Sequence, residues 1–268
     1  MRKLSLIAAV ALASAPAVAG SAAKAASPAA RKVVEVRFDK ARFLREGFVP
    51  LFDGKDLARW KIPEGDNGHW KVLDGVIDYD ARSEAKGRDR NLWTKEAFGN
   101  FALHIEWRFK RTSGLYQMPT ILPDGSYKTD ANGKVIKTPR PNADSGVFVR
   151  GTGKAQINLW CWPCGSGELW SVRNNRSLPA KDRAAAVPKV CADNPVGHWN
   201  ALDVTMKGDR VTIVLNGKTV IDSARIPDVP KTGPIGLQHH GGFNKKTGKY
   251  SPASSLIQFR NVYVKKLD

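Results

Sequence analysis

Apolar and polar residues alternate along most of this chain, which is the pattern of half-buried β-strands. The clearest example is 101–110, where Phe, Leu, Ile, Trp and Phe alternate with Ala, His, Glu, Arg and Lys. Helical periodicity is almost absent, apart from one turn near 181–186. About a dozen short strands separated by turns predict an all-β jelly-roll β-sandwich of two antiparallel sheets. Other expected strands span 33–38, 91–94, 199–207, 210–216, 235–240 and 257–264, and the last of them is expected to pair near the start of the fold. A hairpin is expected over 69–77, with Asp74-Gly75 at its turn.

The stretch 142–162 predicts two strands joined by a turn at 151–153. One face is aliphatic, whereas the other carries a cation, amides and indoles, namely Arg150, Gln156, Asn158, Trp160 and Trp162. Such a face suits a polar ring such as a sugar. The plainer interpretation is an amphipathic sheet with tryptophans tucked under a loop.

Polar residues also occupy the non-core faces of other predicted strands. If those strands share one concave sheet, their side chains meet in a groove. Each residue has a structural alternative, such as a surface ion pair or a loop cap. The residues are His104, Glu106 and Arg108 on 101–110, and Gln238 and His240 on 235–240, with Asp144 and Glu168 as loop candidates. Ordinary glycosidases need two carboxylates beside the bond, and the strand faces supply only Glu106, so that chemistry is not favoured.

The first residues resemble a targeting segment. A basic pair is followed by an apolar run and an Ala-Val-Ala cleavage pattern, which predicts a signal peptide over 1–19 and a linker over 20–32. The apolar run is too short for a membrane span. We therefore expect a periplasmic or secreted protein with one β-sandwich domain over 33–268. Within it, 112–142 is a long basic loop, and loops of that length are often functional lids.

The formal net charge of +18 raises the question of nucleic acid. The basic residues are scattered and no nucleic-acid module signature is present, so nucleic acid is not an expected partner.

The three cysteines are Cys161, Cys164 and Cys191. A redox C-x-x-C should open a helix, but this one ends a predicted strand. A structural disulfide between Cys164 and Cys191 is the favoured pairing, with Cys161 as a buried thiol.

Several segments in order resemble the 3-keto-disaccharide hydrolase family: LFDGKDLARW (51–60), LWTKEAFGNFALHIEWRF (92–109), ADSGVFVRG (143–151), GPIGLQHHG (233–241) and IQFRNVYVKKL (257–267). The resemblance implies a concanavalin A-like jelly roll and an exported enzyme that acts on a small carbohydrate. The common pattern of the family has Asn and Glu where this chain has Asp144 and Lys154.

The resemblance also implies a reaction. A carbonyl at C3 of a sugar acidifies the C2 proton, so a base can form an enolate that expels the C1 substituent, and water then adds. His240 or Glu106 would be the base, and Arg150 with Gln156 would bind the enolate or hydroxyls. A divalent metal ion held by Glu106 and His240 is an alternative way to polarise the carbonyl. The expected substrate-binding residues are Gln156, Asn158, Trp160, Gln238, Asp144, Glu168 and His104. The competing hypothesis is a non-catalytic carbohydrate-binding module on the same fold.

Overall fold

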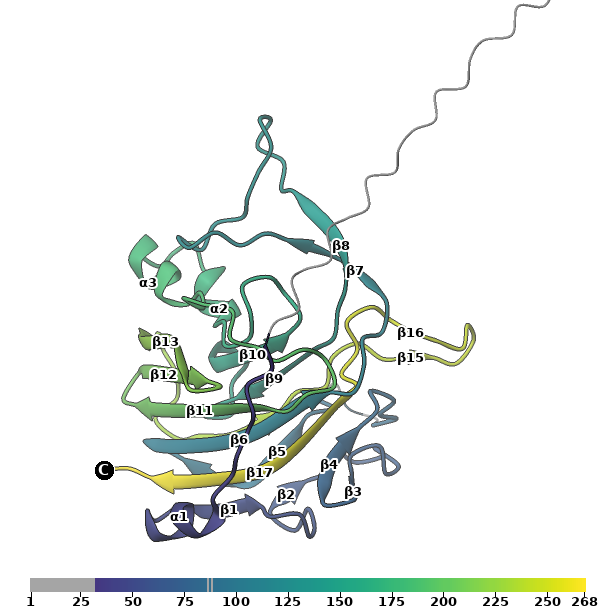
Figure 1. Ribbon diagram of the computed structural model, residues 1–268, viewed down its shortest axis with the longest axis vertical. Coiled ribbons are helices and arrows are strands. Elements are labelled where there is room, and N and C mark those ends of the chain that lie inside the picture. The colour runs from purple at the N-terminus through teal and green to yellow at the C-terminus, as the bar shows by residue number, and fades with distance from the viewer. Residues whose placement is uncertain (1–31, 86, 88) are drawn as a thin grey trace, which may run out of the picture. The chain divides into compact units, whose positions relative to one another are not determined.

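Two antiparallel sheets pack face to face in the part of the chain that the computed structural model describes, residues 32–85, 87 and 89–268 (Figure 1). The predicted signal peptide and all but the last residue of the predicted linker lie outside the described residues. Residues Lys32–Asp268 form one compact unit. The all-β jelly-roll prediction is confirmed.

The larger sheet has the order β13-β12-β11-β6-β17-β4-β3, with β1 paired to β17. This confirms that the last strand pairs with the first, through Val49 opposite Val264. Its strands are β1 (Val49–Phe52), β3 (Lys71–Leu73), β4 (Val76–Tyr79), β6 (Phe101–Phe109), β11 (Asn200–Lys207), β12 (Arg210–Leu215), β13 (Lys218–Arg225) and β17 (Ile257–Lys266).

The smaller sheet has the order β10-β9-β14-β5-β2. Its strands are β2 (Trp60–Lys61), β5 (Leu92–Phe98), β9 (Asp144–Phe148), β10 (Gln156–Trp160) and β14 (Gly233–Leu237). The β9–β10 pairing places Val147 opposite Ile157 and Asn158 opposite Gly146. Because the side-chain period is two, the first pair faces the core and the second faces outward.

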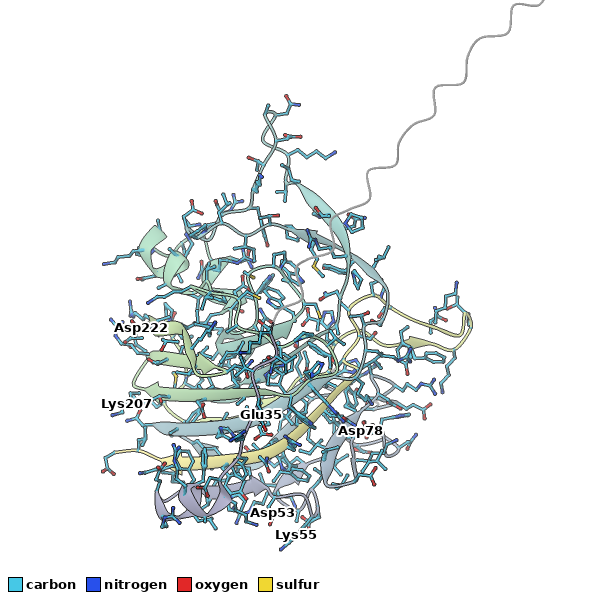
Figure 2. All side chains as sticks on the ribbon, in the orientation of Figure 1. Glu35, Asp53, Lys55, Asp78, Lys207 and Asp222 are labelled. Atoms are coloured by element: carbon cyan, nitrogen blue, oxygen red, sulfur yellow. The ribbon has the colours of Figure 1, made fainter. Side chains whose placement is uncertain are left out.

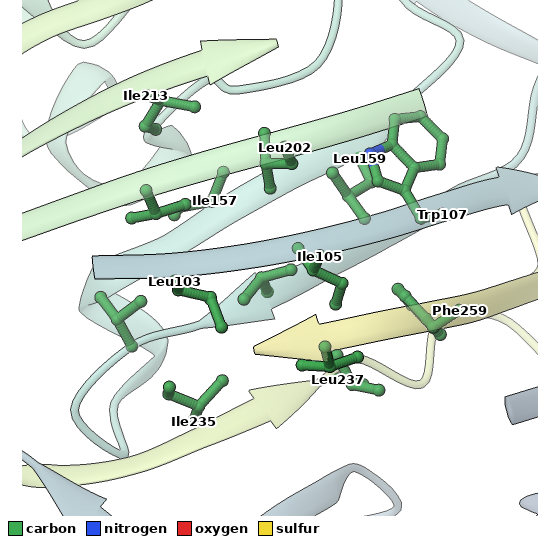
Figure 3. Packing of buried hydrophobic residues seen from close by; sticks show 14 of the residues in the cluster. Leu103, Ile105, Trp107, Ile157, Leu159, Leu202, Ile213, Ile235, Leu237 and Phe259 are labelled. Carbon is green, nitrogen blue, oxygen red and sulfur yellow. The ribbon is translucent and has the colours of Figure 1, made fainter. Parts of the chain in front are cut away.

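The core lies between the two sheets (Figure 3). Leu103, Ile105 and Trp107 of β6 are buried there together with side chains from the smaller sheet. These partners include Ile157 and Leu159 of β10 and Ile235 and Leu237 of β14. Burying one such aliphatic side chain stabilises the fold by roughly 1.5–3 kcal/mol. The outer sheet faces are thereby free for polar residues.

The segment 33–38 is not a strand, contrary to the prediction. It leads into helix α1 (Lys40–Arg45), because the Asp39 side chain caps the helix by accepting a hydrogen bond from the Arg42 backbone at 2.9 Å. Two further short helices are α2 (Trp170–Arg173) and α3 (Ala180–Ala185), and α3 confirms the predicted helical turn. None of the described helices is long and apolar enough to cross a membrane.

The predicted long loop contains a hairpin, β7 (Leu115–Pro119) paired with β8 (Lys137–Pro141). Bridges between Ile121 and Tyr127 and between Thr129 and Val135 fold the chain between these strands back on itself. This segment projects from the sheets at the top of Figure 1. A second small hairpin pairs β15 (Phe243–Asn244) with β16 (Lys249–Tyr250), and the remaining short element is the 3₁₀ turn η1 (Gly153–Ala155). Charged side chains such as Lys55, Lys207 and Asp222 are distributed around the outside (Figure 2).

Candidate functional site

A cavity of about 500 Å³ lies on the outer face of the smaller sheet. The β7–β8 hairpin segment forms one wall, and β9, β10 and the residues that follow β14 form the other. The lining residues are Tyr116, Gln117, Pro119, Tyr127, Val135, Lys137, Asp144, Gln156, Asn158, Trp160, Trp162, Trp170, Gln238 and His240. Five residues expected to bind substrate, Asp144, Gln156, Asn158, Trp160 and Gln238, are thus together with His240.

Side-chain amides form a connected network in this cavity. The Gln156 amide nitrogen donates to Asn158 Oδ1 at 2.7 Å and to Gln238 Oε1 at 2.9 Å. The Asn158 amide nitrogen donates in turn to Glu168 Oε2 at 3.1 Å. Neither Gln156 Oε1 nor Gln238 Nε2 has a side-chain partner among the described residues. One acceptor and one donor therefore remain for the hydroxyls or the carbonyl of a saccharide.

Asp144 and His240 are the carboxylate and the imidazole that line the cavity. The pKa of Asp144 is raised to about 7, chiefly because the carboxyl group is buried. The charge of Glu168 adds to this increase, whereas the charge of His240 opposes it. The Nδ1 atom of His240 lies 2.7 Å from the Ala253 carbonyl oxygen, which can only accept a hydrogen bond. Nδ1 therefore carries the proton in the neutral ring, and Nε2 is left as a proton acceptor. A carboxylate that titrates near neutrality beside an imidazole is suited to proton transfer.

Glu168 supports the cavity from beneath. Its carboxylate is completely buried, accepts the hydrogen bond from Asn158 and forms an ion pair with Arg173. Burial raises the pKa of Glu168, and Arg173 opposes the shift. Arg173 also donates to the Tyr127 hydroxyl at 3.0 Å. The pair thereby connects β10 to the hairpin segment.

Aromatic rings make up much of the remaining wall. Trp160 and Trp162 stack with centroids 4.1 Å apart and planes 5° from parallel, and Tyr116 lies 6.2 Å from Trp162. Trp170 is 48% exposed. The indole nitrogen of Trp160 donates to the Gly165 carbonyl at 2.7 Å, which fixes its ring. Both stacked indoles are buried, and the indole nitrogen of Trp162 has no hydrogen-bond partner among the described residues, so a ligand could accept a hydrogen bond from it.

Glu106 and His104 lie elsewhere, so the expectation that they share this cavity is wrong. Both belong to β6 in the larger sheet, whose outer face is on the opposite side of the sandwich. Glu106 is completely buried and pairs with Arg260 at 2.6 Å. His104 lies 2.7 Å from Asp203, with the rings of Phe38 and Phe43 against it. Burial opposes protonation of His104, but the hydrogen bonds and charges of Asp203 and Glu106 outweigh this effect, so the pKa of His104 is raised above its ordinary value.

Arg150 is also outside the cavity, at the turn that joins β9 to β10. It has a φ of 53°, so the alternation of β9 ends before this residue. Its guanidinium donates to the carbonyls of Gly99 and Pro230 at 3.0 and 3.1 Å and to the Asn100 side chain at 3.2 Å. These contacts hold the loop at Gly99 and Asn100 and the loop at Pro230 against the turn. The guanidinium, which was expected to bind the enolate, is therefore already engaged in structural hydrogen bonds.

The expected metal pair also fails, because Glu106 is on β6 of the larger sheet whereas His240 follows β14 of the smaller sheet and lines the cavity on its outer face. In the described part of the chain, no three His, Cys, Asp or Glu side chains are placed to hold a metal ion.

Cys164 and Cys191 line one pocket with Pro163 and Val190, and no disulfide is present among the described residues. Their pairing stays a prediction.

The sequence interpretation missed Tyr116, Tyr127, Lys137 and Trp170 as cavity residues. The first three belong to the long segment 112–142, whose length was the only signal. Trp162 was placed on the correct face by its alternation with Cys161, but it was not assigned to the site. No local pattern distinguished Trp170, which opens α2.

Comparison with known proteins identifies the family. Residues 47–265 match the profile described as the 3-keto-alpha-glucoside-1,2-lyase-like domain. The chain belongs to this family. Membership makes it a carbohydrate-active protein of the glycosidase-like or carbohydrate-binding kind and confirms the resemblance drawn from the sequence motifs. No protein of curated function is similar enough to count as a match.

Solved structures from Parabacteroides distasonis ATCC 8503 share the fold of this family member. One, described as a candidate glycosyl hydrolase, is 20% identical with a TM-score of 0.51, over 86% of this chain and 99% of that chain. A second with the same description is 22% identical with a TM-score of 0.50, over 82% of this chain and 84% of that chain. At these identities the likeness supports the sandwich fold.

Proposed function

We propose that this protein cleaves 3-keto-glycosides by proton abstraction at C2, elimination of the C1 substituent and hydration. The observation that carries the proposal is Asp144, a carboxylate with a pKa of about 7 that lines the same cavity as His240 and the amide network. A base of this pKa is half ionised at neutral pH and can both accept and return a proton. The family supports a carbohydrate as the substrate.

In the elimination, ionised Asp144 takes the C2 proton and electron density moves to the C3 oxygen. The amide of Gln238 has hydrogens available to bind this oxygen as it becomes negative. The C1–O bond then breaks, and the departing oxygen takes a proton from solvent. A C1–C2 double bond conjugated to the ketone remains.

In the hydration, water attacks C1 and gives a proton to Nε2 of His240, which then releases it to solvent and replaces the proton that the departing oxygen took. Asp144 returns its proton to C2, which restores the saturated 3-keto sugar. The hydrogen bond from Nδ1 to Ala253 keeps the ring of His240 in the tautomer that this step requires. Neither step requires a flanking pair of carboxylates.

The test is release of the C1 substituent from a 3-keto-glucoside by the wild-type protein and by Asp144→Asn, His240→Ala and His198→Ala. His198 is exposed and outside the cavity, so it is the matched control. We expect at least about a hundredfold loss of kcat/KM for the first two variants and none for the control. Absence of release by the wild type from several 3-keto-glycosides, with and without divalent metal ions, would count against the proposal.

A carbohydrate-binding module is the second candidate, because Trp160 and Trp162 form a stacked pair in the cavity wall. Glycan binding without turnover of any 3-keto-glycoside would favour it.

We also propose that the protein acts in the periplasm or outside the cell, on the basis of the N-terminal sequence pattern. Sequencing the mature N-terminus from cells tests this, and retention of Met1 would contradict it.

A further inference from the structure

A second cavity, of about 320 Å³, lies beside the first. The hairpin segment forms one side of it, and residues in and after α2 and in α3 form the other. The chain is close-packed here, since a Cβ on Gly125 would lie 3.2 Å from the Arg183 carbonyl oxygen. The lining includes three arginines, Arg173, Arg176 and Arg183, and neither Asp nor Glu.

Two of these three arginines, Arg176 and Arg183, have no carboxylate in direct contact among the described residues. Arg173 is paired with Glu168, so it contributes no net charge. Arg176 and Arg183 make no ion pair or side-chain hydrogen bond with a described residue, and Arg183 Nε is buried without a partner. The carboxylate of Asp124 is already bound by Ser126, whose hydrogen bonds lower the pKa of Asp124, and the Arg183 charge adds to that shift. The cavity therefore offers guanidinium groups to an anion.

The two cavities share a wall. Tyr127 and Val135 line both of them, and the Arg173 guanidinium lies 4.7 Å from the centre of the Tyr127 ring. The second cavity is also larger than a single inorganic anion requires, given that a water molecule takes up roughly 30 Å³. A ring that carries an anionic group would fill it better than a free ion.

We propose that the second cavity binds the anionic group, a carboxylate or a sulfate ester, of an acidic saccharide whose neighbouring ring occupies the first cavity. This rests on the proposed function in that it requires a saccharide in the first cavity. Arg176 and Arg183 select the acidic unit, and Tyr127 separates the two rings. The natural substrates are then 3-keto-glycosides attached to an acidic sugar.

The test uses equilibrium binding of saccharides without a keto group, so it does not depend on turnover. The probes are glucosyl-glucuronic acid, the neutral glucosyl-glucose of the same linkage, and inorganic sulfate, measured by calorimetry at low and high salt. The proteins are the wild type, the double variant Arg176→Ala/Arg183→Ala and the control Arg45→Ala. Arg45 is an exposed arginine in α1 and lines neither cavity. A thermal melt establishes that each variant is folded.

The acidic disaccharide should bind the wild type at least about tenfold more tightly than the neutral one, and added salt should reduce the difference. The double variant should lose the difference and keep its affinity for the neutral disaccharide, whereas Arg45→Ala should behave as wild type. Equal binding of the two disaccharides, binding of neither, or a difference that survives in the double variant overturns the proposal. Sulfate that binds as tightly as the acidic disaccharide without displacing it also overturns it, in favour of an independent anion site. Failure of the proposed function would appear instead as absent turnover of 3-keto-glycosides.

Discussion

Gln156 donates a hydrogen bond to Gln238 at 2.9 Å, and the two side chains meet directly over Gly146. A Cβ at position 146 would lie 2.9 Å from the Gln156 amide nitrogen and 3.1 Å from Gln238 Oε1. The small residue on β9 is therefore what lets amides from β10 and from the residues after β14 join across the strand between them. The network depends on the absence of a side chain as much as on the amides themselves.

The first prediction concerns Gly146→Ala. The added methyl group should push the two amides apart and lower saccharide affinity by about tenfold, with a change in unfolding free energy of no more than about 1 kcal/mol, because the atoms that must move belong to the flexible side chains of Gln156 and Gln238 and not to the backbone. Gly153→Ala is the matched control, since its Cβ would meet nothing within 4 Å. Calorimetry and thermal melting measure the two effects. Unchanged affinity in Gly146→Ala would mean that the network does not bind the saccharide.

The second prediction concerns the pH dependence of turnover. Asp144 must be ionised to accept the C2 proton, and its pKa is about 7. We expect kcat/KM to rise about tenfold for each pH unit up to about 7 and then to level off. Asp144→Asn should remove this acidic limb together with most of the activity. An unchanged limb in the residual activity of the variant would assign the ionisation to another group.

The third prediction concerns stability. The folded-state pKa of Asp144 is raised above the unfolded value, so the folded protein binds more protons between about pH 4 and 7. The contribution of this group to stability must therefore fall as pH rises through that window. Asp144→Asn should match the wild type near pH 4 and exceed it by roughly 1–3 kcal/mol at pH 8. Denaturant unfolding at both pH values measures this, and a variant that is less stable at pH 8 would contradict the assigned burial.

Alternation along the chain was sufficient to predict the sandwich. Leu103, Ile105 and Trp107 face the core as their spacing requires, and Asp74-Gly75 forms the turn of its hairpin. Segment 33–38 was misassigned because an alternating pattern does not show whether a strand has an edge to pair with. Asp39 is a residue type that favours the start of a helix, and this signal for helix α1 was not weighed against the alternating pattern.

The site was predictable only in part, for a topological reason. Period two shows that Glu106 and Gln156 both leave the core, but not that their sheets face opposite sides of the sandwich. Arg150 shows a second limit, since its positive φ ends the alternation that placed it. The aromatic wall comes from the hairpin segment, whose position over β10 depends on buried contacts such as Arg173 with Tyr127.

The fourth prediction is that Arg150 is structural. Arg150→Ala leaves three oxygen acceptors without their donor and should cost roughly 2–4 kcal/mol of unfolding free energy. Turnover per folded molecule should stay within about threefold of wild type, because the guanidinium is outside the cavity. Arg210→Ala, which removes one exposed hydrogen bond to the Ser223 carbonyl, is the control. A hundredfold loss of kcat in a fully folded Arg150→Ala variant would return Arg150 to the catalytic site.

The fifth prediction concerns the cysteines. Cys164 and Cys191 line the same pocket, and a bond between them would close a loop of about 28 residues, worth roughly 3–4 kcal/mol. Burial raises the pKa values of both Cys161 and Cys164 well above the ordinary value, so the expected pairing rests on the pocket that Cys164 and Cys191 share, which Cys161 does not line. Peptide mapping without reductant should therefore show a Cys164–Cys191 crosslink, with Cys161 alkylated only after unfolding. Cys164→Ser should lower the melting temperature in oxidising buffer to the value that the wild type has in reductant. A Cys161–Cys164 bridge would contradict the pairing and revive the redox interpretation of the C-x-x-C motif.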